Sequence, residues 1–307
     1  KRPPAKRYHF GRDCVSGDVD AVKAHIAAGA SLGPAKSGDP TPLHLAAMAS
    51  RSPEVVRLLV EAGADLEARV DKEPKSLRVY GDRDRFPRLY LLRYATPLAV
   101  AIGTLASRSP EAVAAVPGIV DVLLSAGADP EARNGVGDTM LGAAAGTRTA
   151  VTLTVVERLL AAGAEIEPRG GNGPLMGAVR GNEEIVPVLL AAGADPCRSC
   201  EYGYVPGTRK PTPLHKAAHE GSADVLRLLI AAGADVDVLS ADGVAPLHCA
   251  AAGDDPERVR LLLEAGADPG ARLAKPAGFR EGLSGGTPLE IARELGRDDN
   301  AAILAGA

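Results

Sequence analysis

Short apolar segments alternate along the chain in pairs, and the pattern is clearest between Thr212 and Asp235. Each segment carries apolar residues three or four positions apart, which is the spacing of a helix with one apolar face. Gly221 and Gly233 follow the two segments, where a glycine commonly ends a helix. The apolar positions are Leu214, Ala217 and Ala218 in the first segment and Val225, Leu228 and Leu229 in the second. We therefore expect two short helices, with Leu228 and Leu229 buried between units.

The same pair of segments returns along nearly the whole sequence. A Thr-Pro-Leu-His-like head opens each pair, and 33 residues separate the heads at Thr212 and Ala245. The heads begin at Thr41, Thr96, Thr139, Gly173, Thr212, Ala245 and Thr287, and the glycines of an Ala-Gly-Ala tail are Gly29, Gly63, Gly127, Gly163, Gly193, Gly233 and Gly266. A fixed period of this length indicates a solenoid, because each unit is too small to bury its apolar side alone.

The Thr-Pro-Leu-His head, the Ala-Ala pair, the Leu-Leu of the second helix and the Ala-Gly-Ala-Asp tail resemble the ankyrin repeat. The resemblance covers most of the chain and is specific because it repeats. It implies antiparallel helix pairs joined by finger-like turns, with binding on the fingers and the inner helices. We expect an all-α ankyrin-repeat solenoid of about eight helix-pair units with long finger insertions. The fold does not identify a partner, because function depends on the site.

The repeat boundaries predict one domain over residues 1–307. Residues 8–40 read as an N-terminal capping repeat and 287–307 as a C-terminal one, since terminal repeats have one face in water. Six repeats fill residues 41–286, with finger insertions at 71–94, 197–211 and 270–286. In the third unit, extra residues around Ser107 to Pro117 are expected between its two helices.

Charge is distributed unevenly between the fingers and the body. The three insertions carry a net +7 and Lys1 to Arg12 a further +5, so a whole-chain charge of −4 leaves −16 on the rest. Four cysteines do not make a disulfide framework, and no apolar run reaches the roughly 20 residues of a membrane helix. The chain opens KRPP without an apolar leader, so we expect a cytoplasmic or nuclear protein.

Aromatic residues gather in the same insertions, which contain seven of the nine in the chain. They either pack within their own finger or act as anchors for a partner, because Tyr, Phe and Arg are enriched at interface hot spots. The candidate partner-binding residues of the insertions are Tyr80, Arg83, Arg85, Phe86, Arg88, Tyr202, Tyr204, Arg209, Lys210, Phe279 and Arg280. The ankyrin resemblance adds His219 and Glu220, which occupy variable inner-surface positions.

Histidine and cysteine spacing raises the possibility of a metal. Cys197, Cys200, His215 and His219 fit the spacing of a zinc site. The resemblance gives His215, like the other head histidines, a structural hydrogen bond to the neighbouring turn, so we expect no metal and no cofactor. We also expect no enzyme, because Lys216 stands where a His-Glu-x-x-His motif needs its glutamate.

These features together favour a non-catalytic protein–protein interaction module that binds an acidic protein or peptide on its concave and finger surface. One alternative is a binder of anionic ligands or short nucleic-acid segments, since an acidic body would repel a long duplex. A second is an enzyme whose site is assembled across the fingers. We expect a monomer that does not bind membranes.

Overall fold

The computed structural model describes residues 5–49, 51–70, 94–107, 109–134, 137–168, 173–180, 182–200, 205, 208–273 and 286–307. Within these ranges the chain forms sixteen α-helices, one 3-10 turn and no strand, as an all-α repeat fold requires. The chain divides into two compact units, residues 1–165 (unit 1) and 166–307 (unit 2). None of the described helices is long and apolar enough to cross a membrane.

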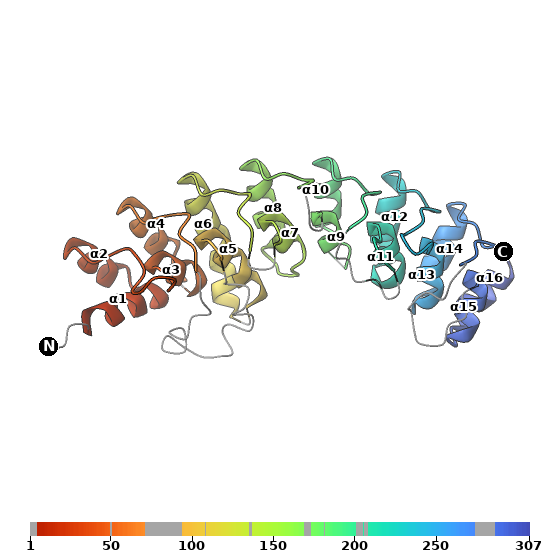
Figure 1. Cartoon of the computed structure of the whole chain (residues 1–307), viewed down its shortest axis with the longest axis horizontal. Coiled ribbons are helices and arrows are strands. Elements are labelled where there is room, and N and C mark those ends of the chain that lie inside the picture. The colour runs from red at the N-terminus through yellow and green to blue at the C-terminus, as the bar shows by residue number, and fades with distance from the viewer. Residues whose placement is uncertain are drawn as a thin grey trace. The chain divides into compact units, whose positions relative to one another are not determined.

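Unit 1 is a row of four helix pairs (Figure 1). First helices pack on first helices and second helices on second helices, so each pair covers the apolar side of the next. The pairs are α1 (Ala5–Ser16) with α2 (Val19–Ala27), α3 (Pro42–Ala49) with α4 (Pro53–Glu61), α5 (Pro97–Gly103) and its 3-10 turn η4 (Thr104–Ala106) with α6 (Pro110–Ser125), and α7 (Met140–Ala145) with α8 (Thr152–Ala161).

Unit 2 repeats the arrangement with four further pairs. They are α9 (Pro174–Ala178) with α10 (Ile185–Ala191), α11 (Pro213–Glu220) with α12 (Ala223–Ala231), α13 (Pro246–Ala252) with α14 (Pro256–Glu264), and α15 (Pro288–Glu294) with α16 (Asp298–Ala305). The first helices α9, α11, α13 and α15 pack in succession, and so do α10, α12, α14 and α16.

Where a head begins with Thr-Pro, the threonine caps the first helix and the proline starts it, as the sequence suggests. Thr96 accepts a hydrogen bond from the backbone N–H of Ala99, and Pro97 occupies the first helical position. Thr287 caps α15 in the same way. A side-chain oxygen satisfies an N–H that has no partner inside the helix, and proline has no N–H to satisfy there.

The head histidines join successive repeats. Each Nδ1 accepts a hydrogen bond from the backbone of its own cap, so the proton lies on Nε2, which donates to a backbone carbonyl of the finger that follows. His44 reaches the carbonyl of Ala95 at 3.1 Å, and His248 reaches that of Ala271 at 3.1 Å. This confirms the structural role predicted for these residues.

One prediction about the core is wrong. Leu229 is fully buried, as expected, but Leu228 is only partly buried, and Leu226 takes its place in the core. Positions i, i+1 and i+4 of α12, which are Val225, Leu226 and Leu229, face the neighbouring helices. The side chain of Leu228 lies on the flank of that stripe.

The extra residues of the third unit are also placed differently from the prediction. Most of them lengthen α6 instead of forming a connection between two helices. Ser109 caps the lengthened helix, and Pro117 lies inside it. The next residue, Gly118, lies so close to α4 that a Cβ there would be 2.7 Å from Cγ of Pro53. Glycine therefore allows α4 and α6 to approach each other.

Candidate functional site

Four of the predicted partner-binding residues lie in the described part of the chain, and all four belong to unit 2: Arg209, Lys210, His219 and Glu220. They form two groups, one at the end of α11 and one in the finger that precedes it. The remaining candidates lie outside the described residues: Tyr80, Arg83, Arg85, Phe86, Arg88, Tyr202, Tyr204, Phe279 and Arg280.

A charged cluster connects the end of α9 with α11. An Oε atom of Glu220 is 3.6 Å from Nε of Arg180, and the other is 3.9 Å from Nζ of Lys216. The Lys216 ammonium also donates to the carbonyl of Met176 at 3.0 Å, and burial lowers the pKa of this lysine. Arg180 is mostly exposed, so the cluster presents a cation to solvent.

His219 lies beside this cluster and is half-buried. Its Nδ1 is buried without a hydrogen-bond partner in the described part of the chain. Burial lowers its pKa. Glu220 opposes this shift and Arg258 adds to it. The imidazole is therefore neutral near pH 7, and we expect it to exchange hydrogen bonds with a partner rather than charge.

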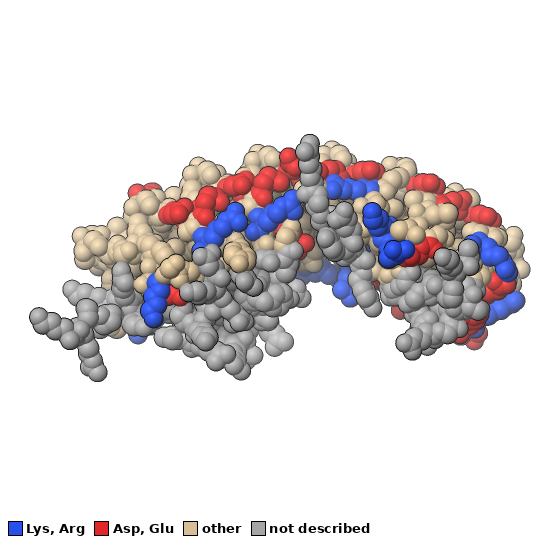
Figure 2. All heavy atoms as spheres, viewed as in Figure 1, with Lys and Arg blue, Asp and Glu red and all other residues tan. Residues whose placement is uncertain are grey.

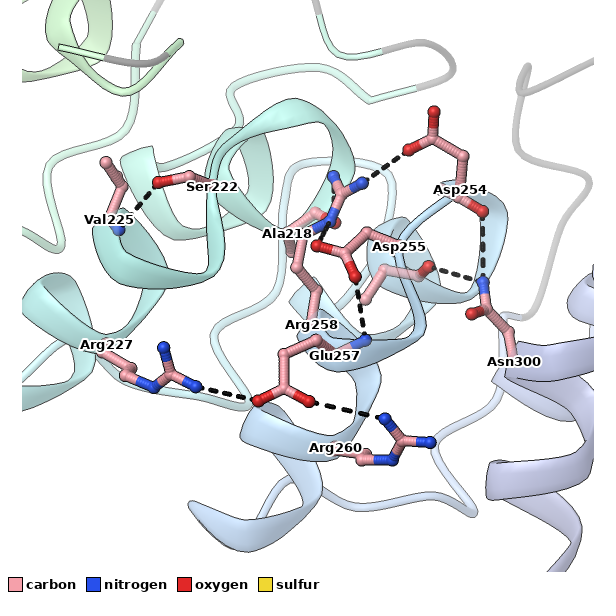
Figure 3. Close-up of polar contacts among 12 residues, drawn as sticks. Ala218, Ser222, Val225, Arg227, Asp254, Asp255, Glu257, Arg258, Arg260 and Asn300 are labelled. Carbon is pink, nitrogen blue, oxygen red and sulfur yellow. Dashed lines mark hydrogen bonds and ion pairs between the residues drawn. The ribbon is translucent and has the colours of Figure 1, made fainter. Parts of the chain in front are cut away.

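A buried guanidinium lies at the carboxyl end of α11 (Figure 3). Arg258 is 3% exposed. It donates to the carbonyl of Ala218 at 3.3 Å and to a carboxylate oxygen of Asp254 at 2.6 Å, and Asp255 lies 3.5 Å from its Nε. The corresponding position of α12 is Val225, a buried aliphatic residue. A buried charge needs such partners, and the carboxyl end of a helix favours a cation.

The next repeat closes α13 in a related way. The amide of Asn300 donates to the carbonyls of Ala250, Ala251 and Gly253 at 3.1–3.2 Å, and Arg297 donates to that of Ala252. The last carbonyls of a helix lack the N–H partners that the interior ones have, and these side chains supply donors to them. The Arg258 and Asn300 contacts hold successive repeats together and supply no reactive group.

The finger before α11 is tied to the following finger through Arg209. Its backbone N–H and its Nε donate to the two carboxylate oxygens of Asp242, at 2.6 and 2.8 Å, and its carbonyl accepts from the N–H of Ala241. Burial of Asp242 opposes its ionisation, but the bonds from Arg209 outweigh this and lower its pKa. Arg209 is thus exposed, as predicted, and already paired with a carboxylate.

Lys210 adopts an unusual backbone conformation. The position two residues before each head, which we call the left-handed finger position, has positive φ in four fingers. Gly137 and Gly243 occupy it where the finger is short, with φ of 90° and 75°. Tyr94 and Lys210 occupy it at the ends of the insertions 71–94 and 197–211, with φ of 61° and 53°. Side chains at such φ cost about 1–2 kcal/mol relative to glycine.

A ladder of carboxylates crosses the fingers and was not predicted. The second residue after the tail Asp accepts a hydrogen bond from the backbone N–H that begins the next finger, as Glu67 does from Asp129 and Asp237 from Asp268. Glu131 and Glu167 do the same. In Figure 2, acidic residues form a row along the upper edge of each unit, with basic residues below it. The acidic residue that recurs at this position of the repeat could have indicated the ladder from the sequence.

The cysteines and histidines with zinc spacing do not come together in the way a site would require. Both ring nitrogens of His215 are engaged, one with Thr212 and the other with the carbonyl of Val244. Cys197 is exposed and its sulfur lies 3.7 Å from the carbonyl of Gly233, whereas Cys200 is buried. Among the described residues no group of three or more His, Cys, Asp or Glu could hold a metal. The absence of zinc stays a prediction.

The stacked helix pairs, capped heads and linking histidines define a helical repeat protein. A family model described as Ankyrin repeats (3 copies) matches residues 112–200 and 201–272, and one described as Ankyrin repeat matches residues 41–71. These matches cover more than half of the chain, which therefore belongs to the ankyrin-repeat family. No curated protein matches it. Ankyrin repeats are generally protein–protein interaction modules and are typically non-catalytic.

Proposed function

We propose that the chain is a non-catalytic module that binds an acidic protein or peptide segment on its inner helices and fingers. The observation that best supports this proposal is the charged cluster at the end of α11 in unit 2. Arg180 is mostly exposed and His219 and Glu220 are partly exposed, whereas Lys216 is largely buried and joins α11 to α9. The exposed guanidinium of Arg180 is available to a partner.

Four cations and two carboxylates meet in the contacts described for this part of unit 2. Arg180 and Lys216 share the carboxylate of Glu220, and the described end of the finger before α11 contributes Arg209, which pairs with Asp242, and Lys210. A local excess of positive charge steers acidic partners and speeds their encounter. The basic and aromatic residues of the finger insertions support the same preference from the sequence, since aromatic anchors supply much of the affinity at interfaces.

Affinity purification with the full chain and a double charge reversal, Arg85→Glu with Arg88→Glu, tests the proposal. We expect the parent to retain a protein partner after nuclease treatment and to lose it as salt is raised. The reversed variant should bind several-fold more weakly with an unchanged melting temperature, because charges in an insertion outside the repeat sequences are expected to contribute little to folding. Loss of binding on nuclease treatment would point to nucleic acid. Equal binding by parent and variant would contradict the proposed surface.

A third chain with Arg57→Glu and Arg227→Glu serves as the matched control. Both arginines lie on second helices, α4 and α12, and both are exposed. Arg57 pairs with Glu54, and Arg227 pairs with Asp224 and Glu257. The net charge change equals that of the test variant. A comparable loss of binding in this control would show that the partner responds to total charge and not to the fingers.

A further inference from the structure

Lys210 has an exposed side chain and an energetically unfavourable backbone conformation, with positive φ. The short fingers place glycine at the left-handed finger position, and Gly243 of the next finger shows that a bare backbone satisfies the fold there. Lys210 is exposed, and no hydrogen bond or ion pair joins its side chain to any residue the structure describes. Backbone strain at a residue whose side chain makes no contact that stabilises the fold indicates that the residue is kept for a function.

Leu239 is the second unusual residue of this surface. It is 63% exposed, more than any other large apolar residue in the described chain. The corresponding finger position, four residues after the tail Asp, is occupied by Arg69 and Arg133 in unit 1 and by Arg272 in unit 2. One finger therefore presents apolar surface to water where others present a guanidinium. Exposure of apolar surface to water is unfavourable, so its burial by a partner would be favourable.

Lys210 and Leu239 lie on two adjacent fingers whose backbones are hydrogen-bonded to each other. The carbonyl of Arg209 accepts from the N–H of Ala241 at 2.9 Å, and the Arg209 N–H donates to Asp242. The chain at Lys210 therefore runs beside the turn that directly follows Leu239. Asp242 lies within this turn, and the two hydrogen bonds from Arg209 already occupy its carboxylate oxygens.

We propose that Lys210 and Leu239 form a contact surface for a partner segment in which a carboxylate side chain neighbours an aliphatic or aromatic one. The inference rests on the proposed function and names the chemistry of the partner at one place in unit 2. The ammonium of Lys210 attracts the carboxylate, and Leu239 loses its hydration against the apolar side chain. A nucleic acid would use the lysine alone, so the exposed leucine favours a protein segment.

Selection of a random dodecapeptide phage library on the full chain tests the partner chemistry. We expect the enriched peptides to share an Asp or Glu beside a Leu, Ile or Phe. One enriched peptide, labelled with fluorescein, is then the probe for fluorescence polarisation with each variant. Enriched peptides without the pair, or no enrichment at all, would overturn the inference whatever the affinity purification shows.

The variants separate contact from folding. Lys210→Asn removes the charge and keeps a residue that tolerates positive φ, and should weaken the peptide about fivefold. Leu239→Ser should weaken it about tenfold. Lys210→Gly relieves strain, so it should raise the melting temperature by a few degrees while also weakening the peptide. Lys36→Asn, an equal charge change at an exposed site in unit 1, is the control and should bind like the parent.

The outcomes distinguish this inference from the proposed function. If the peptide loses affinity with Arg180→Ala but not with Lys210→Asn or Leu239→Ser, the contact surface is wrong and binding on the inner helices stands. If Lys210→Gly raises the melting temperature without changing the affinity, the lysine has no part in binding. A labelled single-stranded DNA dodecamer that binds more tightly than the peptide, and equally to Leu239→Ser, would assign the surface to nucleic acid.

Discussion

Nε2 of His215 donates to the carbonyl of Val244, 2.8 Å away in the following repeat, while Nδ1 accepts from the cap of its own helix. The imidazole can make both bonds only in its neutral form, because a protonated ring has no acceptor. Burial lowers its pKa from 6.5 to about 4, and it lowers the pKa of His44 in unit 1 to about 4 as well. The contact between repeats therefore depends on pH.

The first prediction is a loss of stability in mild acid. The unfolded chain binds protons at these histidines near pH 6.5, whereas the folded chain does so only near pH 4. Their contribution is complete above pH 6.5 and is lost as the pH falls from 6.5 towards 4, by up to about 1.4 kcal/mol per pH unit for each histidine. Urea unfolding between pH 4.5 and 7.5 measures this slope.

His44→Gln with His215→Gln is the control for that slope. Glutamine keeps hydrogen-bonding capacity without titrating in this range, so the variant should be less stable at pH 7 and lose less stability on acidification. An unchanged slope in the double variant would assign the acid sensitivity to other groups.

The second prediction concerns the buried guanidinium of Arg258. Arg258→Ala should lower the free energy of unfolding by about 2–3 kcal/mol, because the stem leaves a cavity and the carbonyl of Ala218 loses a donor. Arg258→Met should stay within about 1 kcal/mol of the parent, since an aliphatic side chain fills the equivalent position in α12 and buried ion pairs add little net stability. Thermal unfolding of both variants measures the difference.

Arg260→Ala is the matched control on the same helix. Its side chain is about half exposed and its contact with Glu257 is on the surface, so we expect a change under about 0.5 kcal/mol. If Arg258→Met proves as damaging as Arg258→Ala, the guanidinium itself and not its volume is what unit 2 requires.

The third prediction compares two adjacent leucines of α12. Leu229→Ala should cost about 2–5 kcal/mol, because Leu229 is fully buried between helices. Leu228→Ala should cost about 1 kcal/mol or less, since Leu228 lies on the flank and is only partly buried. Chemical unfolding of the two variants gives both values, and equal losses would contradict the placement of Leu228.

The leucines also show how far the sequence leads. The repeat period, the head motif and the tail motif predicted the helix pairs, because each unit uses the same helix caps and the same spacing of apolar residues. Helical spacing alone could not assign Leu228 to the flank, since the direction of the stripe depends on the helix that packs against it. The length of α6 was missed for a related reason, because Pro117 suggested a boundary that packing overrides.

The candidate site was less predictable than the fold. The composition of the fingers pointed to Arg209 and Lys210, and family position pointed to His219 and Glu220. The pairing of Arg209 with Asp242 joins residues 33 positions apart, and their contact depends on how two fingers pack. The glycines at equivalent positions of other fingers could have indicated the positive φ of Lys210. This equivalence is recognised only when the repeats are aligned on their backbone.

The last prediction concerns two glycines within unit 1. Gly118→Ala should lower the free energy of unfolding by about 1–3 kcal/mol, because the new Cβ would lie 2.7 Å from Cγ of Pro53 and force α4 and α6 apart. Gly103→Ala should raise it by about 0.5–1 kcal/mol, since a Cβ at the end of α5 meets nothing within 4 Å and alanine restricts the unfolded chain. Thermal unfolding measures both. A gain in stability from both substitutions would mean that α4 and α6 yield at little cost, and a loss from both would mean that Gly103 serves the stack in a way its open surroundings do not reveal.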